Sequence, residues 1–211
     1  MRKLLIITVC MLCFIFCDIK LLYKPQIKTI KVGIIDGAIS SDNISRYGIT
    51  DFLTLTHEEN ITGTHGKMVL DIICNRCSNI EIYYVDALGN NNQSDISNIC
   101  KALEYLEEKD VNIINMSLMT LHNDSNLEKD VRRLINKGIT IIAACLNYSN
   151  ITCYPANYDG VISISNVSNS NASMVFTPEE KRKISKEIGY HPSTSALTAY
   201  YTSICISKLQ K

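Results

Sequence analysis

Apolar residues follow two patterns that alternate along this chain from about residue 31 to the C-terminus. Short uninterrupted runs rich in Val and Ile predict strands buried on both faces of a sheet, and runs with apolar residues three or four positions apart predict helices. The predicted strands are residues 31–36, 80–85, 111–116, 138–144 and 161–164. Two helices are predicted over residues 94–109 and 127–137, and a third lies around 179–183. Two more begin near residues 65 and 192. This alternation predicts an α/β fold, a doubly wound parallel sheet with helices on both faces.

The first 23 residues follow a different pattern. Arg2 and Lys3 precede an unbroken apolar run from Leu4 to Cys17, which is typical of an export signal. No small-x-small cleavage site follows the run, so we favour an uncleaved membrane anchor over a removed signal; a buried N-terminal helix is the alternative. We therefore expect an anchor or signal in residues 1–23 and one domain in residues 24–211. The two N-terminal cations favour placing that domain outside the cytoplasm.

Composition narrows the possible functions only slightly. The chain has 211 residues, of which 46% are hydrophobic, and this suits one domain with a sizeable core. The net charge is zero, so there is no electrostatic reason to expect binding to nucleic acid. We expect a monomer. Of the nine cysteines, Cys74 and Cys77 form a CxxC pair at the end of a helical pattern, with no second pair to complete a zinc site. A disulfide or redox role for this pair is kept as an alternative.

Two candidate chemical groups lie near the start of the domain. Asp36 ends the first predicted strand, so it should emerge at the carboxyl edge of the sheet, where open α/β sheets bind ligands. His65 opens the next helix beside Gly66 and should face the same crevice. Each residue has a simpler explanation, because Asp36 could only cap its turn and an isolated histidine in a loop is usually not functional. His57 competes with His65 but has neither the following glycine nor the helix.

A third candidate group lies at the start of the last helix. Ser193 and Ser195 both fall in its N-terminal turn, where backbone N–H groups and the helix dipole favour an anion such as a tetrahedral intermediate. A serine at this position is more often a simple helix cap. The sequence pattern alone leaves both interpretations open.

Taken in order, these segments resemble the motifs of the subtilisin-like serine proteases, the subtilase or S8 family. The order Asp, His, Ser is that of the family, and the resemblance covers the chain from about Lys31 to the C-terminus. The matching segments are Val32–Gly37, Thr64–Val69, Val111–Leu118, Ile142–Asn147, Tyr154–Ala156 and Ser193–Ser195.

The resemblance implies a role for each matching residue. Ser195 would be the nucleophile, His65 the general base and Asp36 the group that orients and stabilises the imidazolium. Asn147 would donate its side-chain amide to the oxyanion, and removing such a donor from a subtilisin lowers turnover by roughly 10²–10³-fold. Ser117, Leu118 and Met119 would bind the substrate backbone as an edge strand.

The chain also departs from the family pattern. Met119 and Thr120 replace glycines, which should reshape the pocket for the residue before the cleaved bond, and Ser193, Met68 and Asp71 replace other family residues. The helix at His65 runs almost directly into the strand at Ile80, without the loop that binds calcium in many relatives, so we expect no metal and no cofactor.

Three functions therefore remain open from the sequence alone. The first is an active serine endopeptidase acting on a peptide or protein substrate, with the maturation of one specific peptide as its narrower form. The second is a catalytically silent subtilase fold that binds peptides. The third is a thiol-based redox or metal module built on Cys74 and Cys77.

Overall fold

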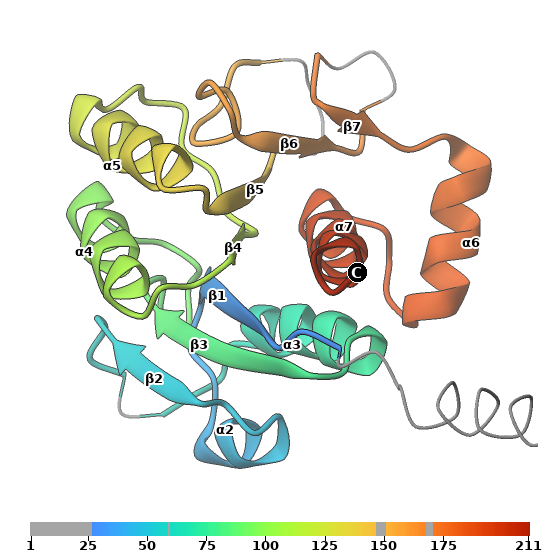
Figure 1. The fold of residues 1–211 in the computed structure, drawn as a ribbon, viewed down its shortest axis with the longest axis horizontal. Helices are drawn as coiled ribbons and strands as arrows, with labels where there is room; N and C mark the ends of the chain where they lie inside the picture. The colour runs from blue at the N-terminus through green and yellow to red at the C-terminus, as the bar shows by residue number, and fades with distance from the viewer. Residues whose placement is uncertain (1–26, 59, 147–150, 168–170) are drawn as a thin grey trace, which may run out of the picture.

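The computed structural model describes residues 27–58, 60–146, 151–167 and 171–211. Its centre is a seven-stranded sheet in the order β2-β3-β1-β4-β5-β6-β7, and every neighbouring pair is parallel (Figure 1). The strands are β1 (Ile30–Asp36), β2 (Asp51–Thr54), β3 (Ile80–Asp86), β4 (Ile113–Met116), β5 (Thr140–Ala144), β6 (Ile162–Ser165) and β7 (Met174–Val175). The predicted doubly wound parallel α/β fold is confirmed.

Helices connect the strands and cover both faces of the sheet. They are α2 (Ser41–Arg46), α3 (His65–Arg76), α4 (Ile96–Glu108), α5 (Ser125–Asn136), α6 (Pro178–Ile188) and α7 (Thr194–Leu209). Figure 1 shows α4 and α5 on one side of the sheet and α3 and α7 on the other, with α6 beyond α7. The chain therefore has the three-layer arrangement that the alternating pattern predicts.

The strands are apolar on both faces because a hydrophobic core lies on each side of the sheet. Successive residues of one strand point to opposite faces, so Ile34 belongs to the core under α3 and α7, and Ile35 belongs to the core under α4 and α5. Ile113 and Ile114 divide in the same way on β4. All four side chains are fully buried. This double burial explains the continuous Val and Ile runs, which a sheet with one wet face would not need.

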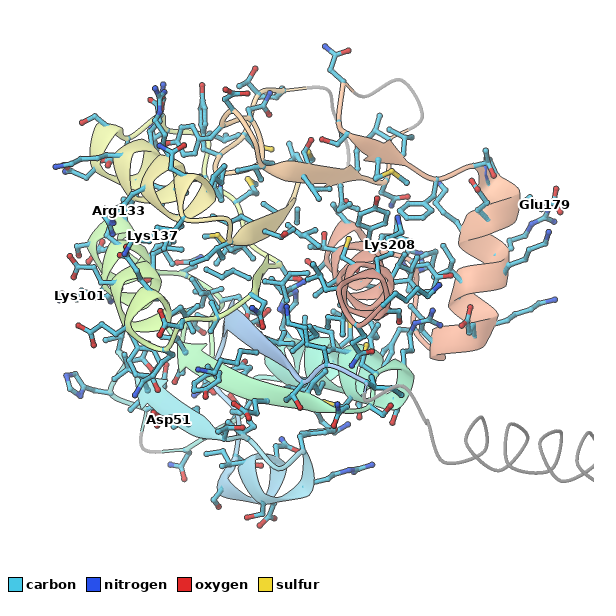
Figure 2. The ribbon with its side chains drawn as sticks, viewed as in Figure 1. Asp51, Lys101, Arg133, Lys137, Glu179 and Lys208 are labelled. Carbon is cyan, nitrogen blue, oxygen red and sulfur yellow. The ribbon has the colours of Figure 1, made fainter. Side chains whose placement is uncertain are left out.

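Ion pairs fasten α5 to α4 at the outer surface. Arg133 Nη2 lies 2.9 Å and Lys137 Nζ 2.5 Å from the Glu107 carboxylate. Figure 2 labels Arg133 and Lys137 where α5 faces α4. Ion pairs at the protein surface contribute little each, so the buried apolar stripe of Leu127, Val131 and Leu134 is the main source of stability in this contact.

The structure contains three short elements that the apolar pattern did not predict. Helix α2 buries none of its residues, β2 is a half-buried edge strand, and β7 has two residues. Helix α4 begins two residues later than the predicted residue 94, with Asp95 as its N-cap residue.

The N-terminal prediction falls outside the described residues, because the structure describes the chain from residue 27 onward. Within the described parts of the chain, no helix is both long and apolar enough to span a bilayer.

Candidate active site

Two polar residues meet where the direction of chain winding changes. From β1 the chain builds β2 and β3 on one side, and from β4 it builds the strands on the other side. In the register of these two neighbouring strands Ile35 pairs with Met116, so the next residues, Asp36 and Ser117, lie side by side at the carboxyl edge. A crevice is expected outside this switch point.

The Asp36 carboxylate is completely buried and holds His65. Its Oδ1 accepts hydrogen bonds from the Gly37 backbone N–H and from His65 Nδ1, each at 2.7 Å. Its Oδ2 is also buried and has no hydrogen-bond partner among the described residues. Because a carboxylate can only accept, the neutral imidazole must carry its proton on Nδ1, which leaves Nε2 as a proton acceptor.

The same contact sets the basicity of His65. Burial lowers the pKa of the imidazole, but the hydrogen bond to Asp36 and its negative charge outweigh burial, so the pKa of His65 is raised. The side chain of His65 remains 25% exposed, so the ring can still be reached from solvent. A partly exposed ring with an acceptor nitrogen and a raised pKa is suited to general-base chemistry.

Close packing beneath His65 fixes the start of α3. Tyr84 is fully buried, and its hydroxyl donates to the Gly37 carbonyl at 2.6 Å. A Cβ atom at position 66 would lie well inside 3.0 Å of that hydroxyl, so only glycine fits there. Gly66 therefore allows the first turn of α3 to sit directly over the end of β1, which brings His65 to Asp36.

The two serines at the start of α7 have different partners. Ser193 is the N-cap residue, and its Oγ accepts from the Ala196 backbone N–H at 3.2 Å. Ser195 Oγ instead donates to the Ser117 carbonyl at 3.2 Å. Ser193 is thus engaged as a cap, whereas Ser195 points its hydroxyl toward the end of β4.

A buried polar chain connects that segment to the body of α7. Ser117 Oγ donates to Asn115 Oδ1 at 2.9 Å and lies 3.3 Å from the Ser195 carbonyl. Asn115 Nδ2 donates to Thr202 Oγ1 at 2.9 Å. Asn115 is a residue that reasoning from the sequence missed; its signal was a polar side chain inside an otherwise apolar strand.

The structure brings the predicted residues together in two linked pairs. One pair is Asp36 with His65, and the other is Ser195 with Ser117; Asp36 and Ser117 are neighbours. His65 and Ser195 are both described, and no hydrogen bond joins them in this structure. The competing His57 lies in the loop after β2 and makes no hydrogen bond to Asp36. Asn147 lies outside the described residues.

A cavity of about 730 Å³ opens beside Ser195. Ser117, Leu118 and Met119 line it on one side, and Thr120 holds this wall through two backbone hydrogen bonds to Tyr154, at 2.7 and 2.8 Å. The remaining lining is mostly apolar and contains no Asp, Glu, Lys or Arg. The other lining residues are Leu88, Asn92, Gln93, Ser94, Ile96, Ile99, His122, Leu127, Ala144, Cys145, Leu146 and Tyr154.

Cys145, Cys74 and Cys77 are poorly suited to act as nucleophiles, because the pKa of each thiol is raised. A hydrogen bond with the Cys153 thiol, together with burial, raises the pKa of Cys145 in the cavity wall. Burial raises the pKa of Cys74 to about 12 and that of Cys77 to about 11. Cys74 and Cys77 are free thiols at the carboxyl end of α3. Among the described residues, no three His, Cys, Asp or Glu side chains gather as a metal site.

Comparison with known proteins finds relatives that cover most of the chain. The sequence profile of the subtilase family matches residues 28–205. The minor extracellular protease Epr of Bacillus subtilis (strain 168) is 25% identical over 188 residues, which cover 83% of this chain and 29% of that protein. Subtilisin DY of Bacillus licheniformis is 28% identical over 159 residues, covering 67% and 58%. The chain thus spans less than two thirds of the length of each of these relatives.

Solved structures share the fold. The protease domain of PatA superposes with a TM-score of 0.56 at 19% identity, covering 69% of this chain and 62% of that one. The prenylagaramide maturation protease PagA superposes with a TM-score of 0.52 at 22% identity, covering 64% and 52%. At these identities the similarity supports the fold of the chain and not a particular substrate.

Proposed function

Because this chain belongs to the subtilase family, we propose that it is a serine endopeptidase with Ser195 as nucleophile, His65 as general base and Asp36 as the orienting carboxylate. One observation supports this proposal most strongly. The buried Asp36 carboxylate accepts a 2.7 Å hydrogen bond from His65 Nδ1, at the edge of the sheet where Ser195 also lies.

In the proposed mechanism the Ser195 hydroxyl first leaves the Ser117 carbonyl and turns to His65 Nε2. His65 takes the proton as the Ser195 oxygen attacks the substrate carbonyl, and Asp36 stabilises the imidazolium that forms. The proton then passes to the leaving amine, and water hydrolyses the acyl-enzyme by the same route in reverse. The oxyanion would be held by the Ser195 backbone N–H, since first-turn amides have no acceptor within their helix, and by Asn147.

The cavity beside Ser195 supports a preference for an uncharged residue before the cleaved bond. No Asp, Glu, Lys or Arg side chain lines it, so a charged substrate side chain would lose hydration without gaining an ion-pair partner of these types. Ser117, Leu118 and Met119 would pair with the substrate backbone. We propose the maturation of a specific peptide rather than bulk digestion, and efficient cleavage of casein would contradict this.

The setting of the enzyme is part of the proposal. Residues 24–211 would form the peptidase domain, and residues 1–23 would act as a signal or membrane anchor that places it outside the cytoplasm, as a monomer. Cell fractionation with a protease-accessibility assay tests the location, and sedimentation tests the oligomeric state.

A fluorophosphonate probe tests the catalytic assignment directly, because it reacts only with an activated serine. We expect the folded protein to be labelled and Ser195→Ala to abolish labelling. His65→Ala should slow labelling by about 10⁴-fold or more. Ser193→Ala is the matched control: it removes a cap hydroxyl, costs about 1 kcal/mol of stability and leaves labelling intact. Labelling that survives Ser195→Ala would refute the assignment.

The second candidate function is a catalytically silent peptide-binding protein. It is favoured by one observation, the Ser195 hydroxyl donating to the Ser117 carbonyl and not to His65. The same experiment decides between them, since a folded protein that the probe fails to label would support the silent form.

A further inference from the structure

Asp71 is a buried carboxylate on the helix that carries His65. It lies six residues after His65 in α3 and is 7% exposed. Its Oδ1 accepts a 2.5 Å hydrogen bond from the Tyr47 hydroxyl. Its Oδ2 accepts from Lys67 Nζ at 2.6 Å and from the Tyr190 hydroxyl at 2.5 Å. Both carboxylate oxygens therefore accept hydrogen bonds, and the donors are one cation and two phenols.

The three donors come from different places in the chain. Lys67 is one turn earlier on α3, and Tyr47 is the C-cap residue of α2. Tyr190 lies in the short link between α6 and α7, five residues before Ser195. Asp71 thus joins the helix that carries the proposed base to the segment that leads into the proposed nucleophile.

The link between α6 and α7 is anchored through Tyr190 on two sides. Helix α6 ends at Gly189, which has a left-handed φ of 73°. The Ser185 hydroxyl donates to the Tyr190 carbonyl at 2.8 Å, which fixes the backbone of Tyr190 to α6. The Tyr190 hydroxyl fixes its side chain to Asp71. The start of α7 follows directly, with Ser193 as its cap.

The charge state of Asp71 makes these hydrogen bonds strong. Burial raises the pKa of Asp71, but the hydrogen bonds from Lys67, Tyr190 and Tyr47 and the charge of Lys67 outweigh it, so the pKa is lowered. The pKa of Tyr47 is raised to about 12, first by burial and then by its hydrogen bond to Asp71. The pKa of Tyr190 is raised for the same reasons. At neutral pH an ionised carboxylate therefore accepts from protonated phenols, and such charge-assisted hydrogen bonds are about twice as strong as neutral ones.

We propose that Asp71 is a positioning residue that, through Tyr190, sets the placement of the Ser195 segment relative to the His65 helix. The inference rests on the proposed function, and it assigns a purpose to one of the departures from the family pattern. The two phenol contacts of Asp71 can be tested separately, because they join it to different parts of the molecule. Tyr47 belongs to the end of α2, whereas Tyr190 belongs to the link that leads to Ser195.

Two single-atom substitutions provide a matched test. Tyr190→Phe and Tyr47→Phe each remove one hydroxyl from the same carboxylate, and both should lower stability. For Tyr190→Phe we expect the saturating rate of fluorophosphonate labelling to fall about tenfold, with the half-saturating probe concentration changed by less than about twofold. Tyr47→Phe should leave both quantities within about twofold of the original protein. Asp71→Asn, where it folds, should match Tyr190→Phe.

Amide hydrogen exchange over residues 190–197 gives a readout that does not need activity. Exchange should speed up in Tyr190→Phe and stay unchanged in Tyr47→Phe. Equal labelling rates and equal exchange in the two variants would overturn the proposal. If the original protein is not labelled at all, the proposed function fails. Faster exchange in Tyr190→Phe would then still show that the hydrogen bond between Tyr190 and Asp71 positions the start of α7, but without a catalytic role. Unchanged exchange would reject the positioning role as well.

Discussion

Replacing Gly66 with alanine tests whether close packing over Tyr84 is what brings His65 to Asp36. An added Cβ would fall well inside 3.0 Å of the Tyr84 hydroxyl, and it would also lie 3.0 Å from the Gly37 carbonyl oxygen and from Ile39 Cγ2. Real Cβ atoms do not approach other atoms this closely, so Tyr84 or the start of α3 must move. Tyr84 is fully buried, so its side chain cannot move aside without displacing other core atoms.

The expected cost follows from two contributions. Overpacking a buried site costs about 1–3 kcal/mol, and losing the Tyr84 hydrogen bond to the Gly37 carbonyl adds about 0.5–1.5 kcal/mol, which gives about 1.5–4.5 kcal/mol together. In a helix without this contact, replacing glycine with alanine would instead stabilise by up to about 1 kcal/mol. The sign of the change therefore reports on the contact itself.

Tyr84→Phe provides the internal check, because it removes the atom that alanine would strike. Alone it should cost about 1–3 kcal/mol by leaving the Gly37 carbonyl unpaired. In the double variant the clash with the hydroxyl is gone. Its loss of unfolding free energy should therefore be at least about 1 kcal/mol smaller than the sum of the losses in the two single variants.

Urea unfolding measures these free energies, provided that the slope of unfolding free energy against urea concentration is the same in all variants. Fluorophosphonate labelling reports on the position of His65. Gly66→Ala should slow labelling, since His65 precedes the displaced residue. Gly63→Ala is the control in the same region, because its Cβ would meet nothing closer than 3.5 Å; its change in stability should stay within about 0.5 kcal/mol. A stabilised Gly66→Ala, or strict additivity with Tyr84→Phe, would refute the reasoning.

Two further predictions concern ionisation. The folded pKa of His65 is raised above its ordinary value of about 6.5, so the stability it gains from Asp36 is fully present below that pH and is lost as pH rises through the folded pKa. The difference in unfolding free energy between the original protein and Asp36→Asn, measured by urea unfolding, should therefore shrink as pH rises from about 6.5 through the folded pKa. Labelling of Ser195 should rise over the same pH range. A difference in free energy that does not change with pH would contradict the assignment. Cys74 and Cys77, with pKa values of about 12 and 11, should react with iodoacetamide at neutral pH at least about tenfold more slowly than an exposed thiol, and a disulfide between them in a non-reduced peptide map would show this wrong.

The fold was predictable because its core leaves a regular record in the sequence. Each strand buried on both faces appears as a Val and Ile run, and each such run ends where the sheet edge lies, which located Asp36 and Ser117. Elements with little burial leave no such record. Helix α2 buries no residue and β2 is only half-buried, so neither altered the apolar pattern.

The supporting contacts of the site could not be predicted in the same way. Asp71 and Tyr190 are 119 positions apart, and their hydrogen bond depends on how the link between α6 and α7 lies against α3. No spacing rule relates residues on separate elements at that range. Tyr84 gave no signal either, because a tyrosine in a buried strand is expected for packing alone, and its hydroxyl contact depends on where α3 begins.

The partner of the Ser195 hydroxyl shows how the proposed site divides rigid and movable parts. The backbone of Ser195 is held near Ser117, whose hydroxyl is itself bound to Asn115 and through it to Thr202 of α7. Among the described residues the Ser195 side chain makes one hydrogen bond, which at 3.2 Å is longer than is usual for a hydroxyl donor. Rotation about χ1 moves a serine hydroxyl between staggered positions without moving the backbone, and catalytic hydrogen bonds are often loose before substrate binds. The Ser117 carbonyl also belongs to the segment proposed to pair with substrate, so an incoming backbone would compete for it. Substrate binding would then favour the position of the hydroxyl that faces His65, which rotation about χ1 also makes available to a small probe in the free protein.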